Sequence, residues 1–474
     1  MQGLAELVPM STEWLYLAAA VLFIVGIRDL SSAETARRGN LLAACGMILA
    51  IVGTMQHGLI VQWGWIAVGM VAGGVIGLVM AVFMPMTAMP ERIAIVNGLG
   101  GAASGLVGIC EVIRHVILPA EGTSASDFSS FHVGVAGLEI MLGAMTFTGS
   151  MVAFGKLRGL ISTRPMTYPF QNVVNIGWLL VMLYLIFGLV VGSLDPVFFF
   201  VLAGMALLFG VMFVLPIGGA DMPVVIAMLN AYSGLAAAAT GFVLSNKVLI
   251  IAGALDGSSG LLLSLLMCRA MNRSLTNVLF GAVGGSGGGA QFSGGELQGD
   301  PQSISTVEAA ERLFDARRVI IVPGYGMAAA GAQFAIREMA DVLKERGISV
   351  KYAIHPVAGR MPGHMNVLLA DANVPYDDLV EMEEINPEFA ETDVALVMGA
   401  NDICNPAART AVGSPIYGMP ILDVDKAAQV IVIKRSMSPG FAGIPNELFV
   451  APNCAMLFGD GKQVAEQLIE TLSL

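Results

Sequence analysis

Nine apolar runs of membrane-spanning length occupy the first 270 residues and limit what this chain can fold into. An α-helix needs about 20 predominantly apolar residues to cross the hydrocarbon core of a bilayer, and runs of roughly 18 or more recur here. We place them at 13–28, 40–56, 59–83, 93–113, 132–155, 172–192, 196–217, 222–244 and 247–268. The sequence therefore predicts a polytopic α-helical membrane domain of about nine transmembrane helices over residues 1–273.

The basic residues between the runs predict which ends face the cytoplasm. Nine Lys and Arg residues follow the odd-numbered runs, whereas Arg114 and Lys247 follow the even-numbered ones. Because cytoplasmic loops are enriched in Lys and Arg, we expect the N-terminus outside and everything after Arg273 in the cytoplasm. The segment up to Trp14 has no basic residue and so differs from a signal peptide, and we expect it to be retained.

The composition changes after the last apolar run. Residues 1–274 carry 11 basic and 12 acidic side chains, and residues 275–474 carry 13 and 24. The whole chain is only 13% charged, too little for an ordinary soluble enzyme, and its net charge of −12 argues against a nucleic-acid partner. Five separated cysteines without a C-x-x-C spacing indicate neither a disulfide framework nor a zinc site. Residues 274–305 are glycine-rich, and we interpret them as a flexible linker.

Residues 306–474 predict an α/β doubly wound parallel-sheet (Rossmann-like) domain. A buried strand over 318–323 is followed by Gly324-Tyr325-Gly326-Met327-Ala328-Ala329, then by an amphipathic helix from about 330 to 346 and a strand over 348–354. This G-x-G-x-x-A pattern between a strand and a helix is the dinucleotide fingerprint, in which glycines allow a phosphate to approach the backbone. We expect further strands at 394–398, 421–424, 430–433 and near Met456.

The residues at the strand ends favour NADP over NAD. An NAD site usually has a carboxylate after the second strand, but here that strand leads into a loop ending in Arg360. Lys434-Arg435-Ser436 closes another strand, and such cations and hydroxyls suit a 2′-phosphate. The segment 399–402 would lie at the same sheet edge. The segment 440–443, with Gly440 and Phe441, is either a mobile lid or an ordinary loop.

Polar residues within the apolar runs mark a candidate proton path. Asn97, Glu139, Asn230 and Asp256 lie within runs, and Asp221 lies at the start of the eighth. Each Asn is equally well explained by an interhelical hydrogen bond. A carboxylate is harder to dismiss, because a charge at the bilayer centre costs about 2.5 kcal/mol or more. We therefore expect Asp256 in particular to face a proton path or an aqueous cavity.

Several long motifs, in order along the chain, resemble one family. They are 147–156 and 219–225 in the membrane half, and 323–328, 355–366, 399–402 and 434–437 in the second half. The chain resembles the beta subunit of proton-translocating NAD(P) transhydrogenase over nearly its whole length. The resemblance implies that residues 306–474 bind NADP(H), and that hydride passes directly to or from NAD(H) on a partner alpha subunit.

The resemblance also implies an assembly, a location and a set of contacts. Proton movement would be coupled to NADP(H) binding and release and would favour NADPH formation, in a lipid-embedded homodimer of the alpha–beta unit in the bacterial cytoplasmic (inner) membrane. No catalytic residue is expected in the nucleotide domain, because hydride transfer is the chemistry of the cofactors themselves. The implied nucleotide contacts are Tyr325, Val357, Ala358, Gly359, Arg360, Met361, Pro362, Gly399, Ala400, Asn401, Asp402, Ile403, Gly418, Met419, Lys434, Arg435, Ser436, Met437, Gly440, Phe441 and Asp460, and the membrane positions are Asp221 and Asn230.

Two positions differ from the pattern of the family, and other functions stay open. Asn97 stands where many members have a histidine, so two alternatives stay open for the proton carrier: a histidine of the partner chain, or carboxylates with water. Phe441 stands where a tyrosine is common. A channel or transporter gated by a dinucleotide-sensing domain is an alternative. A purely structural membrane anchor is a third reading, which the intact fingerprint disfavours.

Overall fold

The computed structural model divides into two compact units by the contacts among its residues. It describes residues 10–32, 34–56, 62–118, 129–280, 299–412, 414, 416–440 and 442–473. The first unit takes in residues 1–85, 91–216 and 225–262, and the second takes in 86–90, 217–224 and 263–474. Most of the predicted linker, residues 281–298, lies outside the described residues. The predicted domain limits at 273 and 305 stay predictions.

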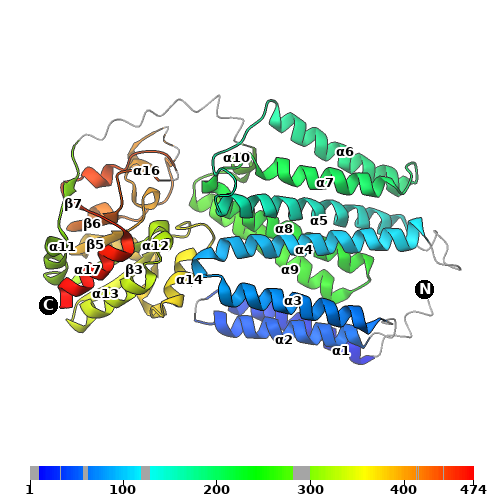
Figure 1. The fold of residues 1–474 in the computed structure, drawn as a ribbon, viewed down its shortest axis with the longest axis horizontal. Coiled ribbons are helices and arrows are strands. Elements are labelled where there is room, and N and C mark those ends of the chain that lie inside the picture. Colours follow the sequence, from blue (N-terminus) through cyan, green and yellow to red (C-terminus); the bar gives the residue numbers. More distant parts are fainter. Residues whose placement is uncertain are drawn as a thin grey trace. The chain divides into compact units, whose positions relative to one another are not determined.

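Nine long apolar helices lie at the predicted positions within the described part of the chain (Figure 1). They are α1 (Met10–Asp29), α2 (Ala36–Met55), α3 (Trp63–Phe83), α4 (Met89–Val112), α5 (Ser130–Leu157), α6 (Gln171–Val191), α7 (Phe198–Val214), α8 (Met222–Val243) and α9 (Lys247–Ala270). Seven are long and apolar enough to cross a membrane, while α7 is shorter, with 17 residues, and α1 carries three charged residues. The prediction of a polytopic helical membrane domain is confirmed.

Glycines let several of these helices touch backbone to backbone. A Cβ atom added at Gly253 of α9 would lie 2.4 Å from the Ala238 nitrogen of α8. In the same way, a Cβ at Gly143 of α5 would lie 2.6 Å from the Gly101 oxygen of α4. Both distances are shorter than any real Cβ contact, so larger side chains would force the helices apart. Small residues therefore set the helix spacing, as is common where lipid offers no hydrophobic driving force.

The second unit contains a parallel seven-stranded sheet with the order β1-β7-β6-β5-β2-β3-β4. The strands are β1 (Gln302–Ser303), β2 (Arg318–Pro323), β3 (Ser349–Ile354), β4 (Leu379–Glu381), β5 (Val394–Met398), β6 (Gln429–Lys434) and β7 (Cys454–Phe458). The helices are α10 (Leu275–Phe280), α11 (Thr306–Phe314), α12 (Tyr325–Ala330), α13 (Gln333–Glu345), α14 (His364–Asp371), α15 (Met382–Ile385), α16 (Ala407–Thr410) and α17 (Gly461–Ser473). The predicted Rossmann-like class is confirmed.

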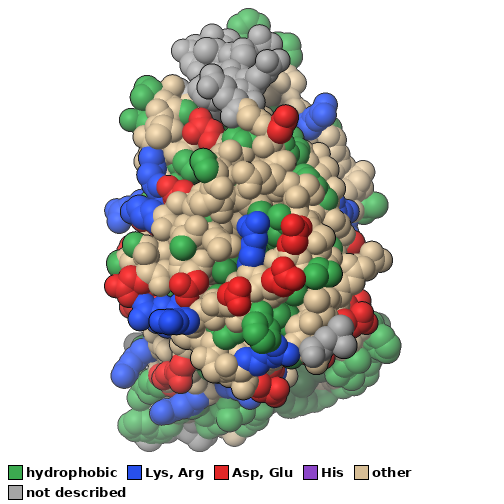
Figure 2. Space-filling view, turned by 90° about the vertical axis from the view of Figure 1, so that its left-hand side faces the viewer, with side chains coloured by type: hydrophobic (Ala, Val, Ile, Leu, Met, Phe, Trp, Pro, Cys, Tyr) green, Lys and Arg blue, Asp and Glu red, His purple; other side chains and the backbone are tan. Residues whose placement is uncertain are grey.

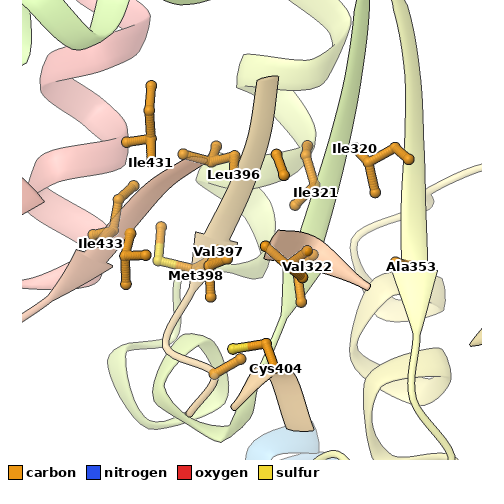
Figure 3. Close-up of a cluster of buried hydrophobic side chains, with 14 of the residues drawn as sticks. Ile320, Ile321, Val322, Ala353, Leu396, Val397, Met398, Cys404, Ile431 and Ile433 are labelled. Atoms are coloured by element: carbon orange, nitrogen blue, oxygen red, sulfur yellow. The ribbon is translucent and has the colours of Figure 1, made fainter. Parts of the chain in front are cut away.

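The sheet core explains why these segments form strands. Ile321 and Val322 of β2, and Leu396 and Val397 of β5, have no exposed surface (Figure 3). Continuous apolar runs without alternation suit central parallel strands, which are covered on both faces. Figure 2, which looks onto this unit, shows acidic and basic side chains interspersed on its outer surface. The unit thus has the apolar interior and charged exterior of a water-exposed α/β domain.

Two predicted elements differ from the structure. The segment 421–424 was expected to be a strand, but it pairs with no strand: the Asn386 amide donates to Ile421 O at 3.1 Å, and Leu422 N donates to Ile403 O at 2.9 Å. Loop and side-chain partners therefore replace a neighbouring strand. The helix expected from about 330 to 346 is α13, which begins at Gln333; the fingerprint residues before it form the short helix α12, which was not predicted and ends at Gly331, where φ is +63°.

Candidate functional site

The loops after β2 and β5 meet at the point where the strand order reverses. From β2 the chain proceeds to β3 and β4, whereas β5 is followed by β6 and β7 on the other side. The Gly326 nitrogen donates to Gly399 O at 2.9 Å, and a Cβ added at Gly324 would lie 2.4 Å from the Ala400 Cα. Open α/β sheets bind ligands at such a switch point, outside the carboxyl ends of the strands. The glycines of the fingerprint are thus placed where a phosphate can approach the backbone.

The side chains of the fingerprint differ in how far they are exposed. Met327 and Ala328 are buried in the core of the unit, so they offer a ligand little beyond their backbone. Tyr325 is half-buried, and the Arg360 guanidinium lies over its ring, with Cζ 4.3 Å from the ring centroid. Ala329 is exposed. Tyr325 and Arg360 therefore form a cation–π pair that connects the first loop to the loop after β3.

Two buried histidines hold the loop after β3. His355 Nδ1 accepts from Val357 N at 3.2 Å, and its Nε2 lies 2.9 Å from Pro420 O. His364 Nδ1 accepts from Arg360 N at 2.9 Å. Because each Nδ1 is an acceptor, each neutral ring carries its proton on Nε2. Burial lowers the pKa of both histidines to about 4, and at His364 the nearby Arg360 charge contributes to this lowering. Sequence reasoning gave these histidines no role.

This loop also needs glycine at one position. Gly359 has a φ of +107°, and a Cβ there would lie 2.5 Å from His364 Nδ1. Conformation and space both exclude a side chain. Of the other predicted contacts in the loop, Ala358 and Met361 are buried, while Val357 and Pro362 are half-buried. The backbone of the loop is therefore its accessible part.

The predicted basic cluster follows β6. Lys434 Nζ donates to the Ser438 carbonyl and lies 4.8 Å from the centroid of the Phe449 ring. Burial lowers the Lys434 pKa, and the nearby Asp402 carboxylate opposes this shift. Arg435 is exposed and pairs with no acidic side chain among the described residues. Arg435 is thus a cation available to an anionic ligand.

Next to Arg435, the cluster is completed by a hydroxyl and an apolar side chain. The Ser436 hydroxyl lies 2.9 Å from that of Ser438, and Met437 packs against the core. The donor set of Lys, Arg and Ser at a strand end has the chemistry that a phosphate monoester requires.

The loop after β5 and the segment 440–442 are in contact. Asp402 Oδ2 accepts from Ala442 N at 3.0 Å, and a Cβ added at Gly440 would lie 2.5 Å from Asp402 Oδ1. The terminal amide of Asn401 lies 3.1 Å from Lys434 Nζ. Phe441, predicted as part of a lid, lies outside the described residues. The loop after β5 therefore connects the segment 440–442 to the basic cluster.

The remaining predicted nucleotide contacts lie in turns and caps. Gly418 has a φ of +77° beside the buried Met419, and a Cβ there would lie 2.4 Å from Asn272 Nδ2. Ile403 is buried. Asp460 Oδ1 accepts from Lys462 N at 3.1 Å at the start of α17. Asp460 therefore caps the N-terminus of α17.

The five predicted proton-path residues lie on or beside α8. Asn230 belongs to the helix, Asp221 directly precedes it, and Asn97, Glu139 and Asp256 are hydrogen-bonded to its residues. From one end to the other, Arg273 Nη1 donates to Asp221 Oδ1 at 2.5 Å, Asn97 Nδ2 donates to Ile226 O at 3.4 Å, Asn230 Nδ2 donates to Asp256 Oδ1 at 3.1 Å, and Thr240 Oγ1 donates to Glu139 Oε1 at 2.6 Å. At a rise of 1.5 Å per residue, positions 226 to 240 span about 21 Å of helix. The structure therefore arranges along one helix the polar residues that the sequence analysis had identified one by one.

Further polar groups line the contact between α4 and α5. Glu139 Oε2, Thr146 Oγ1 and Ser150 Oγ are buried and make no hydrogen bond to the described residues. A Cβ added at Gly108 of α4 would lie 3.2 Å from Glu139 Oε2. One helical turn beyond Gly108, Glu111 pairs with His115 at 3.1 Å. Sequence reasoning missed Thr146, Ser150 and Glu111, because a single hydroxyl or a carboxyl near a helix end carries no sequence signal.

No metal-binding group of three or more His, Cys, Asp or Glu side chains occurs among the residues that the structure describes. Two cavities, of about 350 and 430 Å³, lie in the second unit. The smaller opens at the amino ends of β2 and β3, where Arg318 pairs with Glu391 and Lys351 with Glu388. The predicted nucleotide contacts lie at the opposite, carboxyl ends of the strands.

Comparison with known proteins gives a match over nearly the whole chain. A family model described as NAD(P) transhydrogenase beta subunit matches residues 12–471. Two curated proteins from Rhodospirillum rubrum, both named NAD(P) transhydrogenase subunit beta, are each 50% identical to it over 461 residues. The aligned region covers 97% of this chain and 98% of each relative. The similarity therefore extends through both units.

Proposed function

The chain belongs to the family of NAD(P) transhydrogenase beta subunits, and from that premise we propose that its second unit binds NADP(H) while a partner alpha subunit binds NAD(H). The family is one of proton-translocating enzymes that use nicotinamide dinucleotides, and a beta subunit implies an alpha partner. We further propose that hydride transfer between the two dinucleotides is coupled to proton movement and favours NADPH formation. The observation that carries the NADP assignment is the cation of Arg435 at the end of β6.

The residues present fit a dinucleotide with a 2′-phosphate. The glycines at 324, 326 and 399 leave the backbone open where the two loops meet. Arg435 is exposed beside Lys434 and Ser436, and Arg forms charge-assisted hydrogen bonds to phosphate oxygens. In the loop after β3, Arg360 stands where an NAD site usually has a carboxylate. A 2′-hydroxyl would leave the Arg435 cation without an anionic partner.

The residues of this chain position and enclose the cofactor. The nicotinamide ring supplies the hydride chemistry when it is bound. Tyr325 and Arg360 fix one side of the site through their cation–π contact, and the two histidines fix the backbone of the loop that carries Arg360. Asp402 Oδ2 accepts from Ala442 N and lies close to Gly440. We propose that Gly440 and Ala442 belong to a lid whose movement away from Asp402 would open the site.

The proton route is proposed along α8. Asp221 and Arg273 lie at its N-terminal end, which we place on the cytoplasmic side because the loops there are rich in Lys and Arg. The Asn230–Asp256 pair and the Glu139–Thr240 pair follow in order. Glu139 Oε2, Thr146 and Ser150 provide oxygens that ordered water would satisfy. We propose the bacterial cytoplasmic membrane as the location and a homodimer of the alpha–beta unit as the assembly.

The NADP assignment is tested by Arg435→Ala in the full chain, purified with its alpha partner. NADPH binding should weaken at least tenfold and NADH binding should change less than twofold, because only NADPH carries the phosphate. The control is Arg317→Ala, which removes an exposed arginine at the opposite edge of the sheet. Equal losses for both nucleotides at Arg435 would refute the assignment.

The coupling is tested with Glu139→Gln in sealed vesicles that contain the alpha–beta complex. Proton movement during NADH-driven reduction of an NADP analogue should fall at least tenfold, while NADPH binding stays unchanged. Thr148→Val, on the same helix, is the matched control, because its hydroxyl bonds backbone carbonyls of α5 and α7. Proton flux that starts on NADPH addition without any NAD(H) would support a gated channel instead.

A further inference from the structure

Asp256 is an exposed carboxylate in the middle of a membrane-spanning helix. It is the tenth of the 24 residues of α9, and its side chain is exposed on the surface of this chain. Asn230 Nδ2 of α8 donates to its Oδ1 at 3.1 Å. A carboxylate has about four acceptor positions, and Asn230 is its hydrogen-bond partner among the described residues. Most of the acceptor capacity of Asp256 is therefore not used within the part of the chain that the structure describes.

Lipid is a poor neighbour for this group. A charged side chain at the bilayer centre costs roughly 2.5–3.5 kcal/mol by insertion scales, and ionisable residues in spans almost always face protein or water. Long Lys and Arg side chains near helix ends can reach the interface, but the short side chain of Asp256, about 14 Å along the axis from the start of α9, cannot. The face of α9 that carries Asp256 must therefore be covered by something polar.

That face lies beside the one that α9 uses to pack on α8. Gly253, Gly257 and Gly260 contact the α8 backbone, with added Cβ atoms 2.4, 3.2 and 2.7 Å from α8 nitrogen or oxygen atoms. At 100° per residue, the neighbouring stripe of α9 contains Ala252, Asp256, Ser259, Leu263 and Leu266. Ala252 is half-buried and the other four are exposed. We call these five residues the Asp256 face.

We propose that the Asp256 face is the docking surface for a membrane-spanning helix of the alpha subunit that presents a basic side chain to Asp256. A cation at that depth would satisfy the carboxylate that Asn230 satisfies only in part. The small Ala252 and Ser259, one turn to either side, let a second helix approach closely. The proposal rests on membership of the beta-subunit family, which implies an alpha partner, and not on proton transport.

A second copy of this chain is the less suitable occupant. In the described parts of α1 to α9, every Lys, Arg and His lies in the first or last turn of its helix or beyond it. Lys156 is one of these, and it is buried with its Nζ 3.3 Å from Val214 O at the end of α7. A two-fold contact through the Asp256 face would also bring two carboxylates together. A second copy therefore offers no cation at this depth.

The occupant can be identified by photo-crosslinking in the intact alpha–beta complex in native membranes. A photoreactive residue is placed at Ser259, on the Asp256 face, or at Leu261, which lies at a similar depth on nearly the opposite side of α9. Both positions are exposed. We expect an adduct with the alpha subunit from position 259 and at least tenfold less from position 261. An adduct with a second beta chain, or with lipid alone, from position 259 would overturn the proposal.

The charge pairing is tested by Asp256→Leu, with Asp256→Asn and Leu261→Ala for comparison. Leu makes the span more apolar, so insertion of the beta chain is not weakened. Recovery of alpha with tagged beta in detergent should fall at least tenfold for Leu, fall less for Asn and stay unchanged for Leu261→Ala. Unchanged recovery with Leu would refute the pairing.

Neither readout requires hydride transfer or proton movement. If the complex crosslinks as expected but moves no protons, the proposed function fails and the docking surface stands. If protons move but position 259 labels lipid, the docking surface fails and the proposed function stands.

Discussion

The α8–α9 contact and the meeting of the loops after β2 and β5 both depend on glycine, but for different reasons. At Gly253 of α9 the backbone is helical, and a side chain is excluded only by nearby backbone atoms of Ala238 and Gly234 on α8. At Gly399 the φ is +66°, and a Cβ would also lie 2.4 Å from the Gly326 Cα. At the α8–α9 contact a larger side chain is excluded by lack of space alone. In the loops after β2 and β5 it is excluded both by lack of space and by the backbone conformation.

The largest effect of a single substitution is expected from Gly399→Ala, which violates both limits. Strain in the left-handed region costs roughly 1–2 kcal/mol, and overpacking costs roughly 1–3 kcal/mol more. We expect the second unit to lose about 4 kcal/mol of unfolding free energy, as measured by denaturant titration. The proposed NADPH binding should also be lost, as measured by calorimetry. Gly347→Ala is the control, because Gly347 has a φ of +83° with open space around it, and it should cost about 1 kcal/mol. Equal losses would show that conformation alone matters.

The second prediction concerns acid, which should affect the histidine-held loop and not the glycine contacts. His355 and His364 have pKa values of about 4 in the folded protein, against an ordinary value of 6.5. The unfolded chain therefore binds more protons between pH 6.5 and 4, so stability is full above pH 6.5 and is lost as the pH falls through this window. Each histidine should contribute about 3 kcal/mol to this loss.

Denaturant unfolding of the second unit at pH 7 and at pH 4.5 measures this loss. His364→Gln keeps a polar side chain without a titrating group, so it should remove about half of the pH dependence. A variant with the full acid sensitivity of the natural chain would show that His364 is not among the groups responsible.

The smallest of the three effects is expected from Gly253→Ala, which violates only the volume limit. Its Cβ would lie 2.4 Å from the Ala238 nitrogen, so the helices must separate, at a cost of about 2 kcal/mol. Unfolding in mixed micelles with increasing SDS measures the change. Gly73→Ala of α3, where no atom lies within 4 Å of the added Cβ, should cause no loss. A loss at Gly73 as large as at Gly253 would remove the steric explanation.

The fold followed from the sequence wherever a long local pattern determines an element. The nine apolar helices and the central strands, including β5 at 394–398, lie where runs of apolar residues predicted them. One error, at residues 421–424, has a non-local cause. Ile421, Leu422 and Val424 are apolar, but the hydrogen-bond partners of this segment come from Asn386 and Ile403 and not from a strand. The two- and three-residue strands β1 and β4 are too short to leave a pattern, and were missed.

The parts of the candidate site that consist of short sequence motifs were predicted from the sequence. The glycine fingerprint, the loop with Arg360 and the cluster at Lys434 come from runs of neighbouring residues, and the structure places each at the carboxyl edge of the sheet. The pairing of Glu139 with Thr240 joins residues 101 positions apart. His364 holds the loop because its Nδ1 accepts from Arg360 N, and the presence of a histidine in the sequence does not reveal this contact. Such contacts depend on tertiary geometry, which one sequence does not contain.

The pairing of β1 with β7 affects how the sheet-forming segment can be joined to other chains. The first strand of the sheet, β1, lies beside the last strand, β7, and next to this pair Ile304 N donates to Met456 O at 3.0 Å. The helix α11 packs on α17. The segment from β1 to α17 therefore begins and ends at one sheet edge, away from the switch point between β2 and β5. A segment with adjacent termini can be transplanted, circularly permuted or fused to another chain without disturbing its interior. The segment from β1 to α17 is thus suited to transfer as a single continuous piece, with both of its ends at the same sheet edge.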